Sequence, residues 1–417
     1  MTVSDARPPL EVVIAGAGVA GLEALLGLHD LAGDHVHVTL VDPADNFLLR
    51  PMTVAVPFSV GHATRYPLAD LLHRTGAQHV RSAVESVDPA AHVVITTDGE
   101  QLPYDALVLA LGADARPPSD RALTFDPQNP DQLSGLLRDA EEGYAKRIAI
   151  VIPPEPHWTL PAYELALLLA RDVHGMGMDD VELTLVTPEE RPLALFGTAA
   201  SAAVEADLAA SGIRVEAGGY AELRPGHPTT VLLRPSGRTF DVDRVLTLPG
   251  IRPREIAGMP RGREGFLDVD EHSRVNGVAD VYAAGDGTSF PVKHGGIATQ
   301  QADAAVHHIA ARAGAPVPAT PFVGVLHGRL LTGSQERWMR RAMTGAPADG
   351  EVAEHALWWP PGKVAGRWLA PYLAEIDDAA AGFAHPPGAP HDGVEVAAPA
   401  GSGARIPRGL ELLGRKS

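Results

Sequence analysis

The stretch VVIAGAGVAG, residues 12–21, decides the fold of this chain. It begins with a short apolar run rich in β-branched residues, as expected of a parallel strand that is buried on both faces. Gly16, Gly18 and Gly21 follow with the spacing G-x-G-x-x-G, and the residues after them have the apolar stripe of a helix. A second apolar run ends at Asp42, 21 residues beyond Gly21. The stretch therefore predicts a strand–helix–strand unit with an acid at the end of its second strand.

Each part of this unit has a physical role in holding a dinucleotide. Gly16 permits the tight turn, Gly18 lets the backbone approach a pyrophosphate, and Gly21 lets the helix pack closely on the strand. The helix N-terminus presents free N–H groups and the positive end of its dipole to the phosphates. Asp42 can accept hydrogen bonds from a ribose diol. Strand, helix and acid together make the motif specific for a dinucleotide site.

Composition narrows the class of protein. The chain has 417 residues, 45% of them hydrophobic, which is ordinary for a globular protein of two or three domains. Its net charge of −18 argues against nucleic-acid binding and against purely electrostatic attachment to anionic lipid. No apolar run approaches a membrane span, and no signal peptide is evident, so we expect a cytoplasmic protein. There is no cysteine, which excludes disulfides and thiolate chemistry.

Two further segments are expected at the same edge of the first sheet. ALVLALGA is a buried strand that ends at Gly112, where the backbone must pass close to another group. DVYAAGD ends with Gly285 and Asp286, which places a carboxylate at the carboxyl edge of a parallel sheet, where ligands bind. The loop PVKHGG ends at Gly296, and residues 297–313 are predicted to form a helix.

A second strand–helix–strand unit is predicted from residues 147–152, 162–173 and 181–187. Its connection, PPEPHWTLP (residues 153–161), contains no glycine, and proline has no N–H group to offer a phosphate. Thr187 stands where the first unit has its acid. The second unit thus has the outline of a dinucleotide site without the residues that bind one.

The order of these pieces resembles the FAD-dependent pyridine nucleotide–disulfide oxidoreductase superfamily. Within it, the chain is similar to the branch of sulfide:quinone reductases and type II NADH dehydrogenases through RPMTVAVPF, KHGGIATQQAD and WWPPGKVAGRWLAPYL. The resemblance covers residues 10–376 and implies an α/β fold with two Rossmann-like domains. It also implies FAD contacts, with the pyrophosphate at Gly16, Gly18 and Gly21, the adenosine ribose at Asp42, the ribityl chain at Asp286, and Arg50, Gly112, Gly285 and Gly296 as further contacts.

The departures from this branch limit the function. Without cysteine, the thiol chemistry of sulfide:quinone and disulfide reductases is not available, and the glycine-free second loop leaves NAD(P)H binding open. We expect non-covalent FAD rather than FMN, because FMN lacks the ribose that Asp42 would bind. The leading hypothesis is an FAD-dependent oxidoreductase that passes electrons between an unidentified donor and a small apolar acceptor such as a quinone. An NAD(P)H:quinone oxidoreductase and a flavin-binding scaffold without turnover are the alternatives.

Three charged side chains are candidates for the site. Lys293 is one of four lysines among 34 basic residues, and it lies between Asp286 and the helix that the resemblance directs at the flavin. Its ammonium would favour negative charge on the flavin or bond a quinone oxygen. Glu164 falls where the related dehydrogenases carry a glutamate near the acceptor. A surface ion pair is the alternative for Lys293 and for Arg50, and a solvated helix face is the alternative for Glu164.

The region from residue 316 onward differs in composition. It holds four of the five tryptophans, and residues 335–343 and 364–376 are predicted to form short amphipathic helices. Residues 329–372 carry six basic and four acidic side chains in a strongly acidic chain. We expect this region to cover the acceptor face of the flavin. Contact with a membrane, packing in the core and contact in a homodimer stay open for its tryptophans.

These observations predict a division into domains. The FAD-binding domain is discontinuous and comprises residues 8–115 and 243–315. A second Rossmann-like domain with a degenerate nucleotide loop comprises residues 116–242, and an acceptor-site or interface region comprises residues 316–376. Composition predicts a flexible tail over residues 377–417.

Overall fold

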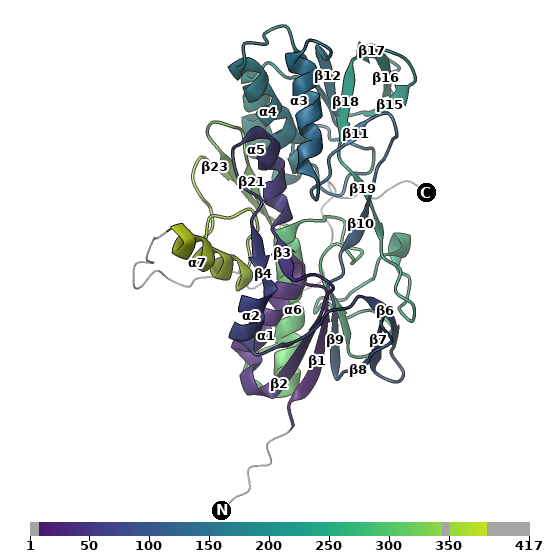
Figure 1. Ribbon diagram of the computed structural model, residues 1–417, viewed down its shortest axis with the longest axis vertical. Coiled ribbons are helices and arrows are strands. Elements are labelled where there is room, and N and C mark those ends of the chain that lie inside the picture. Colours follow the sequence, from purple (N-terminus) through teal and green to yellow (C-terminus); the bar gives the residue numbers. More distant parts are fainter. Residues whose placement is uncertain (1–7, 344–349, 382–417) are drawn as a thin grey trace, which may run out of the picture.

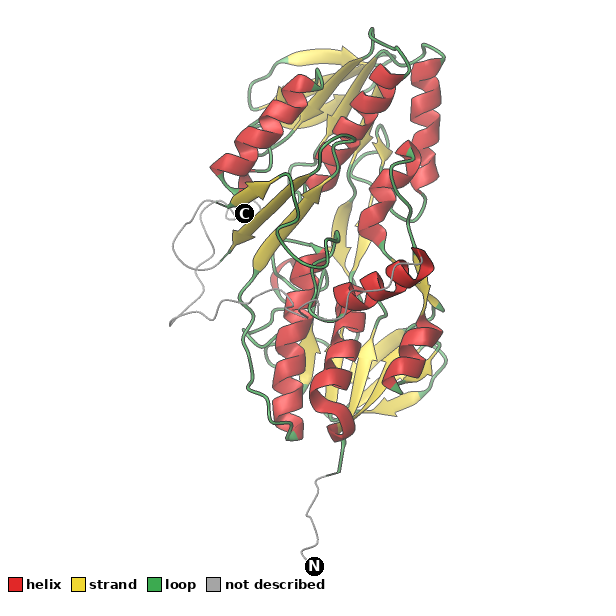
Figure 2. Ribbon diagram, turned by 90° about the vertical axis from the view of Figure 1, so that its left-hand side faces the viewer, coloured by secondary structure: helices red, strands yellow, loops and turns green. Residues whose placement is uncertain are grey.

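The computed structural model describes residues 8–343 and 350–381. Two parallel five-stranded sheets lie toward opposite ends of the long axis, each with helices packed against it (Figure 1). The view turned by 90° shows the same separation, with strands at both ends of the molecule (Figure 2). The predicted α/β fold with two Rossmann-like sheets is therefore confirmed.

The first sheet is built around the strand that precedes the glycine motif. Its order is β20-β9-β1-β2-β5, and all its pairs are parallel. The strands are β1 (Leu10–Ala15), β2 (Val36–Val41), β5 (Gln78–Val80), β9 (Ala106–Leu109) and β20 (Val281–Ala283). Apart from Glu11, every residue of β1 is buried, as its continuous apolar sequence predicts for a strand covered on both faces.

Different layers cover the two faces of this sheet. Helices α1 (Val19–Ala32) and α6 (Gly295–Ala313) pack on one face and share a core with α2 (Leu68–Thr75). The antiparallel strands β6 (Val84–Asp88), β7 (Val93–Thr96) and β8 (Gln101–Pro103) cover the other face. The N-termini of α1 and α6 therefore meet at the carboxyl edge of the sheet, where ligands bind in this class of fold.

The second sheet repeats this plan. Its order is β11-β18-β12-β13-β14, and the strands β15, β16 and β17 cover the face opposite the helices. The elements are β11 (Leu123–Thr124), α3 (Leu133–Glu141), β12 (Arg147–Val151), α4 (Leu160–Gly175), β13 (Glu182–Val186), α5 (Thr198–Ala210), β14 (Arg214–Glu216), β15 (Tyr220–Arg224), β16 (Thr229–Arg234), β17 (Thr239–Val242) and β18 (Arg244–Thr247). Because β18 pairs with β12, we propose a domain boundary after Thr247 rather than before Asp243.

The C-terminal region combines a small sheet with one helix. Strands β21 (Val325–Leu330), β22 (Arg337–Ala342) and β23 (Glu351–Ala353) are antiparallel, and α7 (Leu369–Ala381) packs beside α1. The predicted helix over residues 335–343 is wrong. Trp338 and Met339 enter different cores on opposite faces of β22, as adjacent side chains of a strand covered on both faces do.

Helix α7 also corrects the predicted tail. It continues to Ala381, so the first residues of that tail are helical, and residues 382–417 lie outside the described residues. Short elements complete the fold: β3 (Asn46–Leu48), β4 (Arg65–Pro67), β10 (Ala113–Arg116), β19 (Gly250–Pro253) and the 3-10 turns η1 (Gly33–His35), η2 (Arg50–Phe58), η3 (Pro130–Gln132), η4 (Ala194–Phe196) and η5 (Arg263–Gly265). Strands β10 and β19 pair between the two large sheets.

Candidate functional site

The glycine turn between β1 and α1 has the geometry of a phosphate cradle. Gly16 has a φ of +104°, a conformation that favours glycine. A Cβ atom on Gly21 would lie 1.8 Å from the carbonyl oxygen of Gly16, so only glycine lets the helix approach the turn. A Cβ atom on Gly18 would meet nothing closer than the Ala110 oxygen at 3.9 Å. The space at Gly18 therefore lies open beside a helix N-terminus that has no side-chain cap.

Asp42 holds this turn together as well as facing the predicted ribose position. One of its carboxylate oxygens accepts the N–H of Ala17 at 2.7 Å, and the other accepts that of Ala44 at 2.8 Å. The Nε2 atom of His79 bonds the Asp42 backbone oxygen at 3.0 Å. A carboxylate offers about four acceptor positions, so two remain for a ribose diol. These free acceptor positions fit the ribose hydroxyls in the adenosine half of FAD.

A second group of residues meets at the ends of β9 and β20. Gly112 has a φ of +68° with open space at its Cβ position, and a Cβ on Gly287 would lie 3.3 Å from the Gly112 oxygen. Gly285 donates its N–H to the Oε1 atom of Gln301 in α6 at 2.8 Å. Burial raises the pKa of Asp286, opposed by the nearby charges of Lys293 and Arg50. Asp286 is thus placed near two cations at the sheet edge.

Lys293 is buried, which rules out the surface ion pair. The residue is 9% exposed, its ammonium donates to the carbonyl oxygen of Thr288, and its Nζ lies 3.9 Å from the ring centroid of Phe266. Burial lowers the pKa of Lys293 to about 8, although the charge of Asp286 opposes the shift. Lys293 is thus a buried cation next to the predicted ribityl carboxylate.

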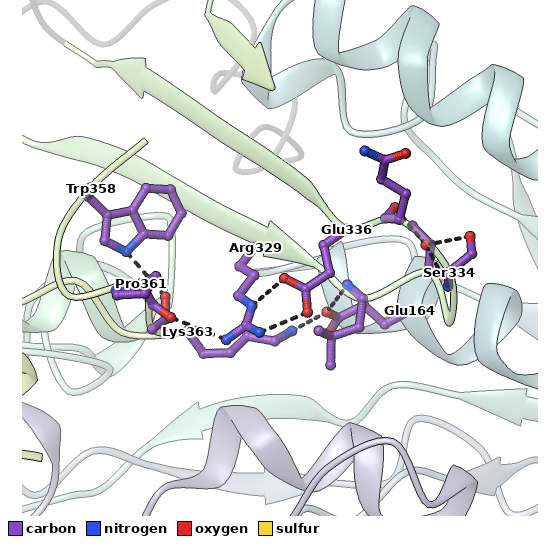
Figure 3. A network of polar contacts seen from close by, with 11 residues as sticks. Glu164, Arg329, Ser334, Glu336, Trp358, Pro361 and Lys363 are labelled. Carbon is purple, nitrogen blue, oxygen red and sulfur yellow. Dashed lines mark hydrogen bonds and ion pairs between the residues drawn. The ribbon is translucent and has the colours of Figure 1, made fainter. Parts of the chain in front are cut away.

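Glu164 belongs to a buried network rather than to a solvated helix face. Its Oε1 atom accepts the ammonium of Lys363 and the N–H of Leu331, the latter at 2.9 Å. Figure 3 shows this ion pair beside the bidentate pair of Arg329 and Glu336, whose two bonds are both 2.8 Å. Burial raises the pKa of Glu164 and lowers that of Lys363, in each case against the attraction of the partner. The network ties α4 to the C-terminal region.

Two buried histidines lie near this network. Within the described residues, Nδ1 of His294 and both ring nitrogens of His327 have no hydrogen-bond partner. The His294 ring lies 4.4 Å from that of Trp158, and the His327 ring lies 5.0 Å from that of Trp358. Burial lowers the pKa of His294 to about 3 and that of His327 to about 4. Both imidazoles are therefore neutral at physiological pH.

Glu23 fixes the other end of the C-terminal region. It is fully buried in α1, and its two carboxylate oxygens accept the N–H groups of Arg367, Trp368 and Leu369 at 2.6–3.1 Å. These groups precede and begin α7, so Glu23 caps that helix from another element. Burial raises the pKa of Glu23 to about 7 despite the three donors. Glu23 and Glu164 are each the fifth residue of their helices.

The predicted site residues fall into two groups. Gly16, Gly18, Gly21, Asp42, Gly112, Gly285 and Asp286 line the carboxyl edge of the first sheet, with Lys293 and the exposed Arg50 close to Asp286. Glu164 lies in the Lys363 network instead. Gly296 lies in the first turn of α6 beside His294, and the charge of Lys363 contributes to lowering the pKa of His294.

Sequence reasoning missed Lys363, His294, His327 and Glu23. The scarcity of lysine that singled out Lys293 applies equally to Lys363, so that signal was present. The shared helix position of Glu23 and Glu164 was a second usable signal. His294 lies in the quoted segment KHGGIATQQAD, next to Lys293, whereas no sequence signal marked His327 among the 18 histidines.

Comparison with known proteins gives a consistent assignment. The profile of the family described as pyridine nucleotide-disulphide oxidoreductase matches residues 10–151 and 162–308. An NADH dehydrogenase-like protein of Mycobacterium tuberculosis is 29% identical over 299 residues, which are 66% of this chain and 72% of that protein. The alternative NAD(P)H-ubiquinone oxidoreductase C1 of Arabidopsis thaliana is 26% identical over 337 residues, 69% of this chain and 63% of the other.

A solved structure extends the similarity across the fold. The sulfide:quinone oxidoreductase of Aquifex aeolicus superposes with a TM-score of 0.72 and 19% identity, covering 89% of this chain and 90% of the other. At this level of identity the likeness shows a shared fold.

Proposed function

The chain belongs to the pyridine nucleotide-disulphide oxidoreductase family and is an oxidoreductase, and from that premise we propose that it binds FAD and passes electrons to a neutral, planar acceptor of the quinone class. The observation that carries the acceptor class is the set of buried ring nitrogens on His294 and His327 that have no hydrogen-bond partner in the described part of the chain, together with the buried Glu164–Lys363 pair. Bound FAD would supply the electron transfer. The protein's side chains would bind the acceptor and control charge around it.

The residues of the first unit fit FAD. The turn at Gly16 and Gly21 places the backbone close to the open space at Gly18, where the pyrophosphate would lie at the N-terminus of α1. Asp42 retains acceptor capacity for the adenosine ribose. Asp286 would hold the ribityl chain, and Lys293 would favour negative charge near it. Gly112, Gly285, Gly296 and Arg50 remain proposed contacts to the cofactor.

The acceptor class follows from the chemistry of the second group. A neutral imidazole donates an N–H bond to a carbonyl oxygen without adding a charge, and the low pKa values of His294 and His327 keep both rings neutral. The rings of Trp158 and Trp358 lie against these histidines, and aromatic faces suit a planar ligand. Quinones combine a planar ring with carbonyl oxygens. Glu164 and Lys363 would hold charge and protons next to them.

The cofactor is tested by releasing it. Denaturing the purified yellow protein and separating the supernatant by HPLC should give free FAD. Release of FMN alone, or flavin that stays attached to the polypeptide, contradicts the proposed cofactor.

The acceptor is tested by equilibrium binding. Titrating the oxidised holoprotein with a short-chain quinone should shift the flavin absorbance band with a saturable dependence on concentration. Lys363→Met should weaken this binding, whereas Lys146→Met, at an exposed lysine paired with Asp180, should leave it unchanged. A spectrum that does not respond to quinone, or equal binding by both variants, contradicts the proposed acceptor site.

One other function of the chain has specific support, and a second is defined by the outcome of the test. The names of the Mycobacterium and Arabidopsis relatives favour an NAD(P)H:quinone oxidoreductase as the second candidate. A flavin-binding scaffold without turnover is the result if the bound flavin cannot be reoxidised by any quinone.

Membrane contact through residues 329–372 and a homodimer both stay predictions. Trp338 and Trp358 are buried, whereas Trp359 is 53% exposed, so Trp359 is the tryptophan through which such a contact would act. No described helix is both long enough and apolar enough to cross a bilayer. Liposome flotation of the full chain and of its Trp359→Ser variant tests the membrane contact. Equal partition of the two proteins contradicts it.

A further inference from the structure

The second Rossmann-like unit repeats the layout of the first but not its turn. Between β1 and α1 the chain uses only residues 16–18, whereas between β12 and α4 it uses residues 152–159. The longer connection lets Ala162 occupy the helix position that requires glycine in the first unit, where a Cβ on Gly21 would lie 1.8 Å from backbone. The turn that would bring backbone N–H groups to a pyrophosphate is therefore absent from this unit.

The first turn of α4 has few N–H groups to offer. Pro161 has none, and the Ala162 N–H already bonds the Thr159 oxygen at 2.9 Å. Thr159 is buried, although a residue that faces phosphate must be accessible from the ligand side. The N-terminus of α4 therefore offers a phosphate fewer backbone N–H donors and a more rigid backbone than the N-terminus of α1.

The connection itself is attached to the FAD-binding half of the protein. The His157 oxygen accepts the N–H of Lys293 at 3.2 Å, and the ring of Trp158 lies 4.4 Å from that of His294. The His157 ring also lies 6.0 Å from that of Phe266, edge to face. These contacts hold the connection against the loop that begins α6, rather than leaving it open for a ligand between the two units.

The end of β13 is closed by a buried hydrogen-bond network. Thr187, the counterpart of Asp42, is fully buried, and its Oγ1 atom donates to the Glu189 carboxylate at 3.1 Å. The hydroxyl of Tyr163 in α4 donates to the same oxygen at 2.6 Å. Burial raises the pKa of Glu189 to about 7. The Thr159 side chain and the Leu193 backbone also donate to Glu189, so its carboxylate has four donors and, unlike Asp42, no acceptor position left for a ribose diol.

The family profile supports the same conclusion from sequence. It matches residues 10–151 and 162–308 and omits residues 152–161, which contain this connection. We infer that the second Rossmann-like unit of this protein does not bind a nicotinamide dinucleotide, so that neither NADH nor NADPH reduces the flavin through this unit. The inference needs only the flavin of the proposed function, not its quinone acceptor.

Anaerobic rapid mixing of the oxidised holoprotein with NADH and, separately, with NADPH tests this inference. The flavin absorbance should persist at millimolar nucleotide for as long as it does in a buffer control, while dithionite bleaches it completely. Titration of NADH with the protein should also leave the fluorescence of the nucleotide unchanged. Bleaching within seconds by either nucleotide, or a saturable change in NADH fluorescence, overturns the inference.

The same preparation separates this inference from the proposed function. A flavin reduced by light and then reoxidised by quinone supports the proposed acceptor, whatever NADH does. A flavin that is neither reduced by NADH nor reoxidised by quinone supports the inference and contradicts the proposed function. A protein reduced by NADH and reoxidised by quinone keeps the proposed function and overturns the inference.

Discussion

Replacing Gly18 and Gly21 by alanine, one at a time, separates the two tasks assigned to the glycine turn. A Cβ on Gly18 would touch protein only at the Ala110 oxygen, 3.9 Å away, which is ordinary contact. A Cβ on Gly21 would lie 1.8 Å from the Gly16 oxygen and 3.0 Å from its carbonyl carbon. The first methyl therefore enters the space proposed for the pyrophosphate, and the second collides with the protein itself.

The expected magnitudes differ accordingly. Gly21→Ala forces α1 away from the turn and should lower the free energy of unfolding by about 1–3 kcal/mol or more, the usual cost of overpacking. Gly18→Ala changes only a helix cap in extended conformation, so the apoprotein should lose less than about 1 kcal/mol. Displacement of the pyrophosphate by the Gly18 methyl should weaken FAD by about tenfold to hundredfold, which is roughly 1.4–2.8 kcal/mol.

The assay pairs urea unfolding of each apoprotein with titration of FAD by its fluorescence. Gly18→Ala should retain the unfolding midpoint of the wild-type apoprotein and lose FAD affinity. Gly21→Ala should lose both. Unchanged FAD affinity in Gly18→Ala would refute the placement of the cofactor, and equal destabilisation of the two apoproteins would refute the packing argument.

Three further predictions concern buried charges. Lys293→Met should retain FAD but lower the flavin reduction potential and slow the reaction with acceptor, because a cation near Asp286 is lost. The control variant Lys146→Met should change neither the potential nor the rate. An unchanged potential in Lys293→Met contradicts the proposed role. Lys363→Met leaves the carboxyl of Glu164 buried without its cation and should lower the free energy of unfolding, measured in urea, by about 3–5 kcal/mol. The double variant with Glu164→Gln should recover most of this loss. A double variant as unstable as the single one contradicts the coupling. The pKa of Glu23 is about 7 in the folded protein, above the ordinary glutamate value of 4.5, so between these values the folded state holds a proton that the unfolded chain releases. The free energy of unfolding should therefore fall as pH rises from 4.5 to about 7. Glu23→Gln should remove this part of the pH dependence, and parallel pH profiles for the two proteins would disprove it.

The features predicted well from sequence depend on short-range patterns. The turn, the helix and the acid of the first unit lie within residues 12–42, where spacing and periodicity fix the geometry locally. The buried strands that precede Gly112 and Asp286 were equally visible as apolar runs, and they form β9 and β20. The edge of the first sheet could therefore be assembled from sequence, because parallel strands place their carboxyl ends together.

The features that were missed depend on contacts between distant segments. Glu23 meets the N–H of Arg367 across 344 positions, and Glu164 meets Lys363 across 199. Strand β22 has the composition of an amphipathic helix, and its pairing with β21 and β23 decides its structure. Composition likewise showed that the connection over residues 153–161 lacks glycine, but not that Trp158 would pack against His294.

The reoxidation of light-reduced protein by a quinone tests the central claim most directly. The holoprotein is photoreduced without oxygen and mixed with a short-chain quinone, and the return of the flavin absorbance is followed at increasing quinone concentrations. We predict complete reoxidation at a rate that saturates with quinone and falls in Lys363→Met. A flavin that stays reduced, or a rate that rises without saturation and is the same in that variant, would contradict an acceptor site at this position.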